Sequence, residues 1–112
     1  MTEGAKTILF AVSDLAKAKG TYAALLGIPP QTDSPYYVGF DVAGQHIGLA
    51  PGDGPSPVAY WHVSDIEAKL AEITAAGGTV KEAPKKVGPG RTVATITDPD
   101  GNVLGLLQDR PE

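Results

Sequence analysis

Apolar residues recur along the chain first with the spacing of a strand and then with that of a helix, and this order occurs twice. In the first half, a β-rich run over residues 7–12 precedes a segment, residues 15–26, whose apolar positions fall on one helical face. The pattern then predicts a short extended piece near Gln31 and two strands. These strands cover residues 36–42 and 46–50 and are joined by a turn at 43–44.

The second half predicts the same series of elements. A strand over 58–63 and a helix over 66–76 are followed by three strands, over residues 79–83, 92–97 and 103–108. The Asp98-Pro99-Asp100-Gly101 sequence between the last two is a strong turn signal, because proline fixes φ and glycine accepts positive φ. Each half therefore reads as βαβββ.

The two halves also share identical or similar residues at fixed offsets, which indicates an internal repeat. Val12-Ser13-Asp14-Leu15 returns 51 residues later as Val63-Ser64-Asp65-Ile66, and Gly48-Leu49 returns 57 residues later as Gly105-Leu106. The second copy therefore carries about six extra residues, which we place in a longer, flexible loop over 85–90.

The expected fold is α+β: one domain, residues 1–112, made of two tandem βαβββ modules over 5–51 and 57–109. A Pro/Gly-rich linker joins them. Neither half could bury both faces of its sheet alone, so we expect one curled mixed sheet around a cavity, with the helices outside.

Composition narrows the range of partners. The 112 residues are 42% apolar and 20% charged, with no cysteine, and nine basic residues against thirteen acidic ones give a net charge of −4. Nucleic acid is not an expected partner, because the basic residues are few and scattered. No apolar run reaches the length of a membrane span, and the first six residues are too polar for a signal peptide, so we expect a cytoplasmic protein without a membrane partner.

The repeated Val-Ser-Asp-(Leu/Ile) junctions, Ala75-Ala76-Gly77-Gly78 after the second helix, and Asp98-Pro99-Asp100-Gly101-Asn102 before the last strand carry a family likeness. Together they resemble the vicinal oxygen chelate superfamily, which includes glyoxalase I, the extradiol dioxygenases and the bleomycin-resistance proteins. The resemblance covers nearly the whole chain. It implies a small-molecule cavity and, in many members, a divalent metal ion.

The resemblance also places the metal ligands, one on the first strand and one on the last strand of each module. The matching positions here are Thr7, Gly48, Val58 and Gly105. Glycine and valine offer no donor and a neutral threonine hydroxyl is a weak one, so we expect no metal and no cofactor. We expect these four positions to converge on one space left open by their small side chains.

Strand alternation assigns the residues that would line this cavity. If Thr7, Gly48, Val58 and Gly105 point inward, the polar and aromatic residues expected to contact a ligand are Tyr36, Phe40, His46, Tyr60, His62 and Arg91. Trp61 falls on the helix side and is expected in the core. The lining is mostly apolar, which is typical of a small-molecule site.

The other candidate groups have structural interpretations. His46 and His62 are assigned to the cavity wall, with acid/base catalysis or metal binding as alternatives. Asp14 and Asp65 begin helices and are expected to act as caps, with Ser13, Ser64 and the Ser64–Glu67 spacing. Lys85, Lys86 and Arg91 flank a loop that could meet an anionic group, although a solvated loop is the expected reading.

We therefore expect a metal-independent protein that binds a small organic molecule, such as an antibiotic, as the resembling resistance proteins do, with no catalytic residue. One alternative is a lyase, isomerase or dioxygenase with a relocated metal or a His46/His62 acid/base site. Another is a degenerate subunit that pairs with a different chain. The resemblance implies a homodimer.

Overall fold

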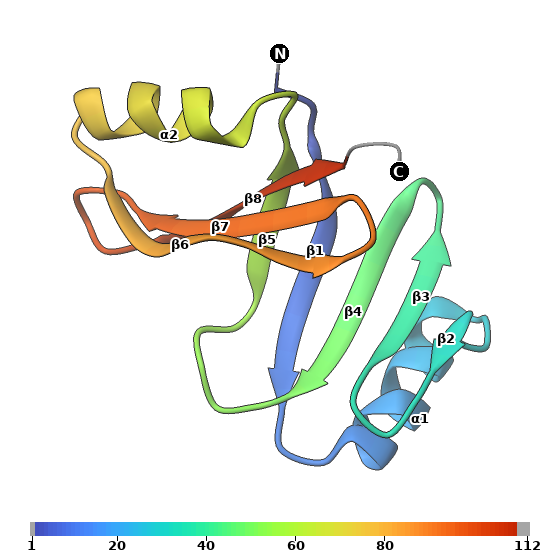
Figure 1. Ribbon diagram of the computed structural model, residues 1–112. Helices are drawn as coiled ribbons and strands as arrows, with labels where there is room; N and C mark the ends of the chain where they lie inside the picture. Colours follow the sequence, from blue (N-terminus) through green and yellow to red (C-terminus); the bar gives the residue numbers. More distant parts are fainter. Residues whose placement is uncertain (1, 110–112) are drawn as a thin grey trace. The chain divides into compact units, whose positions relative to one another are not determined.

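The computed structural model describes residues 2–109, which form two helices and eight strands (Figure 1). In chain order these are β1 (Ala5–Val12), α1 (Leu15–Leu26), β2 (Thr32–Asp33), β3 (Val38–Val42), β4 (Gln45–Pro51), β5 (Val58–His62), α2 (Ile66–Ala75), β6 (Thr79–Gly88), β7 (Arg91–Thr97) and β8 (Val103–Asp109). The predicted α+β class and the βαβββ order of each half are confirmed.

The chain divides into two compact units that correspond closely to the two repeats. One unit is Lys6–Val58; the other takes the residues from Ala59 onward together with those up to Ala5. The N-terminal segment belongs with the second unit because the Glu3 amide donates to the His62 carbonyl at 2.8 Å. Whether the two halves enclose the expected cavity depends on how the two units are placed, so the cavity stays a prediction.

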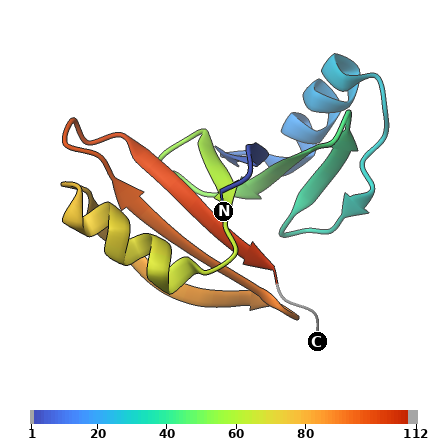
Figure 2. The ribbon, with the colours of Figure 1, turned by 90° about the horizontal axis from the view of Figure 1, so that it is seen from above.

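The first unit is a four-stranded sheet in the order β2-β3-β4-β1 with α1 on one face (Figure 2). β1 runs parallel to β4, and β3 runs antiparallel to β4. Under α1 lies a core of four buried residues, Val38, Phe40, Ile47 and Leu49. The helix begins after Asp14, whose carboxylate accepts from the Lys17 amide, and ends at Gly27 with φ of 75°.

The second unit repeats this plan in the order β5-β8-β7-β6, with β5 parallel to β8 and α2 over one face. Its core contains Val63, Ile66, Leu70, Ala94, Ile96 and Leu106, and Trp61 packs against it as expected. Asp65 caps α2 by accepting from the Ala68 amide. The buried Gln108 side chain of β8 accepts from the Ile66 amide at 2.6 Å, which joins the start of α2 to the sheet.

The flexible loop expected over 85–90 is wrong for most of its length. β6 continues to Gly88 and pairs with β7 through Lys85 opposite Val93 and Lys86 opposite Thr92, so only residues 89–90 make the turn. Register shifts on either side of Glu82 and before Gly88 absorb the irregular residues, Pro84 among them. Pairing with β7 thus overrides the local Pro and Gly signals.

Within residues 2–109, neither helix is long and apolar enough to cross a membrane.

Candidate functional site

One glycine occupies the middle of the last strand of each unit, on the sheet face opposite the helix. Gly48 of β4 lies opposite Leu9 of β1 and Gly39 of β3. Gly105 of β8 lies opposite Tyr60 of β5 and Thr95 of β7. These are the positions at which the resemblance places a metal ligand in each module.

The space above Gly48 is occupied by Tyr37. A Cβ atom at position 48 would collide with the Tyr37 hydroxyl oxygen, and it would lie 2.9 Å from Tyr37 Cζ and 3.1 Å from Leu9 Cδ1. The absence of a side chain at Gly48 is therefore what lets the phenol lie across the strand. No room is left there for the side chain of a metal ligand.

Tyr60 has the same relation to Gly105 in the second unit. A Cβ at position 105 would collide with Tyr60 Cδ2 and lie 2.6 Å from Cε2 and 2.7 Å from Cγ, so the ring rests on the glycine backbone. Burial raises the pKa of the Tyr60 phenol above its usual 10.0, and the nearby Glu82 carboxylate raises it further. Glu82 also accepts a hydrogen bond from Thr95 Oγ1 at 3.1 Å.

A three-residue network extends from Tyr37 across the first unit. Tyr37 Oη lies 2.6 Å from His46 Nε2, and His46 Nδ1 lies 2.7 Å from Asp41 Oδ1. The Tyr37 and His46 rings are nearly parallel, at an interplanar angle of 9°. Gly39 makes the space for the imidazole, because a Cβ there would lie 2.7 Å from His46 Cε1.

The second unit places its histidine beside an ion pair. Arg91 Nε donates to Asp109 Oδ1 at 2.8 Å and its Nη2 to Oδ2 at 3.2 Å, while His62 Nδ1 lies 4.0 Å from Asp109 Oδ2. Arg91 is therefore joined to a carboxylate of its own chain. Contact of Arg91 with a ligand stays a prediction, and it would compete with this ion pair.

Two expected lining residues are placed wrongly by the sequence reading. Tyr36 is 80% exposed, and Phe40 is fully buried under α1 together with Val38. The error is one of register: the two-residue turn at 43–44 sets Val42 opposite Gln45 and so Phe40 opposite Ile47, on the helix face. A slip of one residue moves a whole strand to the other face, and Tyr37, Gly39 and Asp41 take the places expected for their neighbours.

The remaining sequence assignments of faces hold within each unit. Thr7 lies opposite His46 on the face away from α1, and Val93, Thr95 and Leu107 share a face with Gly105. The matched ligand positions are not direct partners, since Leu9 lies opposite Gly48 and Tyr60 lies opposite Gly105. The convergence of Thr7, Gly48, Val58 and Gly105 on one point involves both units and stays a prediction.

Four residues of these groups were not predicted from the sequence: Tyr37, Asp41, Glu82 and Asp109. The pattern held one usable signal for the first two, because Gly39 and Gly48 sit in strands where glycine is unfavourable unless something approaches closely. That close approach comes from two aromatic rings. Glu82 was hidden by the irregular register of β6.

The donor set does not fit the divalent metal that the fold family implies. Of the four matched positions only Thr7 carries an oxygen, and the space over both glycines is filled by tyrosine side chains. Within the described residues no group of three or more His, Cys, Asp or Glu side chains is arranged to hold a metal ion. The polar groups that these faces present are tyrosine, histidine and carboxylate side chains.

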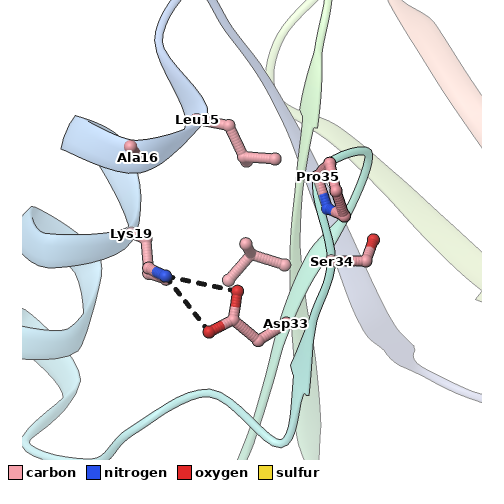
Figure 3. Close-up of a pocket in the computed structure, with 7 residues that line it drawn as sticks. Leu15, Ala16, Lys19, Asp33, Ser34 and Pro35 are labelled. Atoms are coloured by element: carbon pink, nitrogen blue, oxygen red, sulfur yellow. Dashed lines mark hydrogen bonds and ion pairs between the residues drawn. The ribbon is translucent and has the colours of Figure 1, made fainter.

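A separate pocket of about 410 Å³ lies on the other side of the first unit, between α1 and the β2–β3 segment (Figure 3). Its walls are Leu15, Ala16, Lys19, Asp33, Ser34, Pro35 and Val38. Lys19 Nζ bridges to both Asp33 oxygens at 3.1 and 3.2 Å across it. This pocket is distinct from the Tyr37–His46–Asp41 network, because Val38 points to the opposite face of β3 from Tyr37 and Asp41.

The duplicated βαβββ units define the class of the protein as a vicinal oxygen chelate fold. A profile of the Glyoxalase/Bleomycin resistance protein/Dioxygenase superfamily matches residues 4–106, so the chain belongs to this superfamily. No curated protein matches the chain.

Solved structures of similar fold share little sequence with the chain. A superfamily member from Vibrio splendidus is 18% identical, with a TM-score of 0.71 over 93% of this chain and 97% of that one. A methylmalonyl-CoA epimerase from Streptomyces coelicolor is 14% identical, with a TM-score of 0.74 over 99% and 100%. A Mn(II)-bound glyoxalase from Novosphingobium aromaticivorans is 20% identical, with a TM-score of 0.73 over 97% of this chain and 40% of that one. At these identities the likeness concerns the fold alone.

Proposed function

We propose that this chain is a metal-independent binding protein for a small organic molecule, of the glyoxalase/bleomycin resistance type. One observation carries the proposal: the last-strand positions that would hold metal ligands are glycines, and a tyrosine side chain covers each of them. A surface of phenol rings and hydroxyls suits an organic ligand better than a bare cation.

Each unit offers its own polar groups to a ligand. The first unit offers Tyr37, His46 and Asp41, and the second offers Tyr60 with Glu82 and His62 with Asp109. Aromatic faces favour a planar ligand, and the carboxylates favour one with hydrogen-bond donors or positive charge. An antibiotic that carries aromatic rings and amines is one molecule of this class.

Calorimetric titration against a panel of planar organic molecules, with a chelator present throughout, tests the proposal. Trp61 is a poor reporter because it packs against the helix-side core. We expect Tyr37→Phe to weaken the binding of a hit that contacts the first unit and Tyr60→Phe that of a hit that contacts the second, whereas Tyr36→Phe, in the exposed neighbour of Tyr37, leaves both unchanged. Failure of the whole panel, or equal effects of all three substitutions, would count against a site at the tyrosines.

The assembly is part of the same proposal. We propose a homodimer located in the cytoplasm, without nucleic acid or membrane partners, supported by the family resemblance and by the scattered basic residues. Native mass spectrometry of the purified chain tests the assembly: a species of twice the chain mass supports it. A lone monomer, or recovery only with a different chain, contradicts it.

A further inference from the structure

We propose that Tyr37, His46 and Asp41 form a metal-free proton relay, in which Tyr37 Oη takes a proton from a weakly acidic hydroxyl group of the bound small molecule. The relay is defined by two short contacts in series, 2.6 Å from Tyr37 Oη to His46 Nε2 and 2.7 Å from His46 Nδ1 to Asp41 Oδ1. A histidine held by a carboxylate on one nitrogen and facing a hydroxyl with the other is the arrangement that activates a hydroxyl group in enzymes.

The direction of the relay follows from the donor and acceptor inventory. An ionised Asp41 can only accept, so His46 Nδ1 carries the proton and donates it to Asp41. In the neutral imidazole the other nitrogen, Nε2, is then an acceptor, and Tyr37 Oη donates to it. The phenol proton is therefore already directed at the group that would receive it.

The proton transfer balances without a co-reactant. The O–H bond of the ligand breaks and its proton forms a new bond to Tyr37 Oη, while the original phenol proton passes to His46 Nε2. The products are a ligand oxyanion and an imidazolium, and the imidazolium is paired with the Asp41 carboxylate. Transfer in the reverse direction restores all three side chains.

The surroundings hold these groups in place. Gly39 and Gly48 lie directly opposite each other and leave the space that the His46 and Tyr37 rings occupy. The Tyr37 backbone is fixed at both ends by Ser34, whose hydroxyl oxygen accepts from the Tyr37 amide at 3.0 Å and whose amide donates to the Tyr37 carbonyl at 2.9 Å. The Asp41 amide donates to Gln31 Oε1 at 2.7 Å.

The network is also reachable from solvent. Tyr37 is partly buried, and the side chains of His46 and Asp41 are 25% and 64% exposed. The network lies on the face of the sheet away from the hydrophobic core under α1, so these polar side chains are not part of that core. A small molecule that approaches this face meets the phenol oxygen together with the imidazole ring.

The ligand class rests on the proposed binding function, whereas the relay itself does not. A phenol or an enol is the ligand class that fits this site best. Its hydroxyl proton is acidic enough to be transferred to the Tyr37 oxygen, and its planar frame can stack on the Tyr37 and His46 rings.

Covalent labelling with benzenesulfonyl fluoride tests the relay without a ligand. The Tyr37 oxygen attacks sulfur, the S–F bond breaks, fluoride leaves and the phenol proton goes to His46. Tyr36 is the internal control, since it is adjacent in sequence and 80% exposed. We expect peptide mass spectrometry to show Tyr37 labelled roughly ten-fold or more faster than Tyr36. If accessibility alone decides, Tyr36 reacts first, and that result overturns the relay.

Variants show whether the preference comes from the network. Asp41→Asn and His46→Phe should remove most of the Tyr37 rate and leave the Tyr36 rate unchanged. Gln31→Leu removes the side-chain bonds to the Asp41 amide and the Pro29 carbonyl but neither contact of the relay, so it should have a smaller effect. The unchanged Tyr36 rate, with circular dichroism, shows that a variant is folded. A Tyr37 labelling rate that neither Asp41→Asn nor His46→Phe changes contradicts the proposal. A ratio of Tyr37 to Tyr36 labelling rates near one in the wild-type protein contradicts it as well.

The ligand class is tested with 4-nitrophenol, which turns yellow when it ionises, and with 4-nitroanisole, which has the same frame without the acidic proton. In a buffer near neutral pH, where free 4-nitrophenol is partly yellow and an ordinary imidazole can still accept a proton, we expect the wild-type protein to increase the yellow absorbance and Asp41→Asn to give a much smaller increase. Binding of both compounds without an increase in absorbance would support the binding function and overturn the proton transfer. Binding of neither would count against the phenol class, while the labelling ratio still decides the relay.

Discussion

The hydroxyl group of Tyr37 lies over Gly48, in the space that any side chain at position 48 would need. The resemblance places a metal ligand at this position in related enzymes, so one replacement by glycine removes a donor and admits a phenol at the same time. Gly105 and Tyr60 repeat the relation in the second unit. The two rings come from different places in the repeat, since Tyr37 precedes β3 and Tyr60 belongs to β5, so each unit fills the space over its glycine in its own way.

Gly48→Ala should displace Tyr37, because the new Cβ collides with its hydroxyl oxygen. Overpacking of this kind costs about 1–3 kcal/mol of unfolding free energy, measurable by urea denaturation. Gly20→Ala is the matched control, since a Cβ there meets nothing within 4 Å and the residue is helical. That control should gain about 0.5–1 kcal/mol. A Gly48→Ala protein as stable as wild type would show that Tyr37 does not occupy this space.

Gly105→Ala should be destabilising only while the Tyr60 ring is present. In a double-mutant cycle with Tyr60→Ala, the cost of Gly105→Ala should largely disappear, with a coupling free energy of about 0.5–3 kcal/mol. Additive effects in the cycle would contradict direct contact between the ring and the glycine.

Gln108→Leu should lower the unfolding free energy by about 1–3 kcal/mol, because it leaves the Ile66 amide at the start of α2 without its buried acceptor. Gln31→Leu removes the same kind of bond, from the Asp41 amide, at an exposed site, together with the exposed bond from Gln31 Nε2 to the Pro29 carbonyl. Water can replace both bonds there, so the cost should stay below about 0.5 kcal/mol. Equal costs in chemical denaturation would remove the special role of Gln108.

Tyr60 should ionise at higher pH than an ordinary phenol, because burial and then Glu82 raise the pKa of Tyr60 above 10.0. The folded state thus holds this proton more tightly than the unfolded state. The corresponding stability is fully present below pH 10 and is lost as pH rises through the folded pKa. The difference in tyrosinate absorbance between the wild-type and Tyr60→Phe proteins isolates the Tyr60 signal among the four tyrosines, and the same difference is measured in the Glu82→Gln background. Glu82→Gln should lower the pKa of Tyr60, and no change would show that the carboxylate has no influence.

Much of the fold was predictable because its signals are local. Residues 15–26 are helical as the apolar spacing indicates, and the turn at Asp98 forms as its residues predict, with Asp98 Oδ1 accepting from the Asp100 and Asn102 amides. These hydrogen bonds, first of all those from Asn102, lower the pKa of the Asp98 carboxyl group. Local chemistry of this kind is visible in a short window of sequence.

The candidate site was less predictable because it depends on register. His46, Tyr60 and His62 lie on the face expected for them, but a shift of one residue in β3 and the residues just before it put Tyr37 and Asp41 where Tyr36 and Phe40 were expected. Each of the two alternating sets of residues contains an aromatic side chain, Tyr36 and Phe40 in one and Tyr37 in the other. Alternation alone could therefore not show which set faces the helix. The tight turn after Val42 made the choice, and long-range pairing with β7 likewise extended β6 through a Pro- and Gly-containing segment.

Metal content measured together with ligand affinity tests the central claim most directly. Elemental analysis of protein purified without chelator, followed by calorimetry of one bound organic ligand before and after chelator treatment, should show substoichiometric Ni, Zn, Fe and Mn and one unchanged affinity. A stoichiometric metal ion whose removal abolishes binding would contradict a metal-independent site.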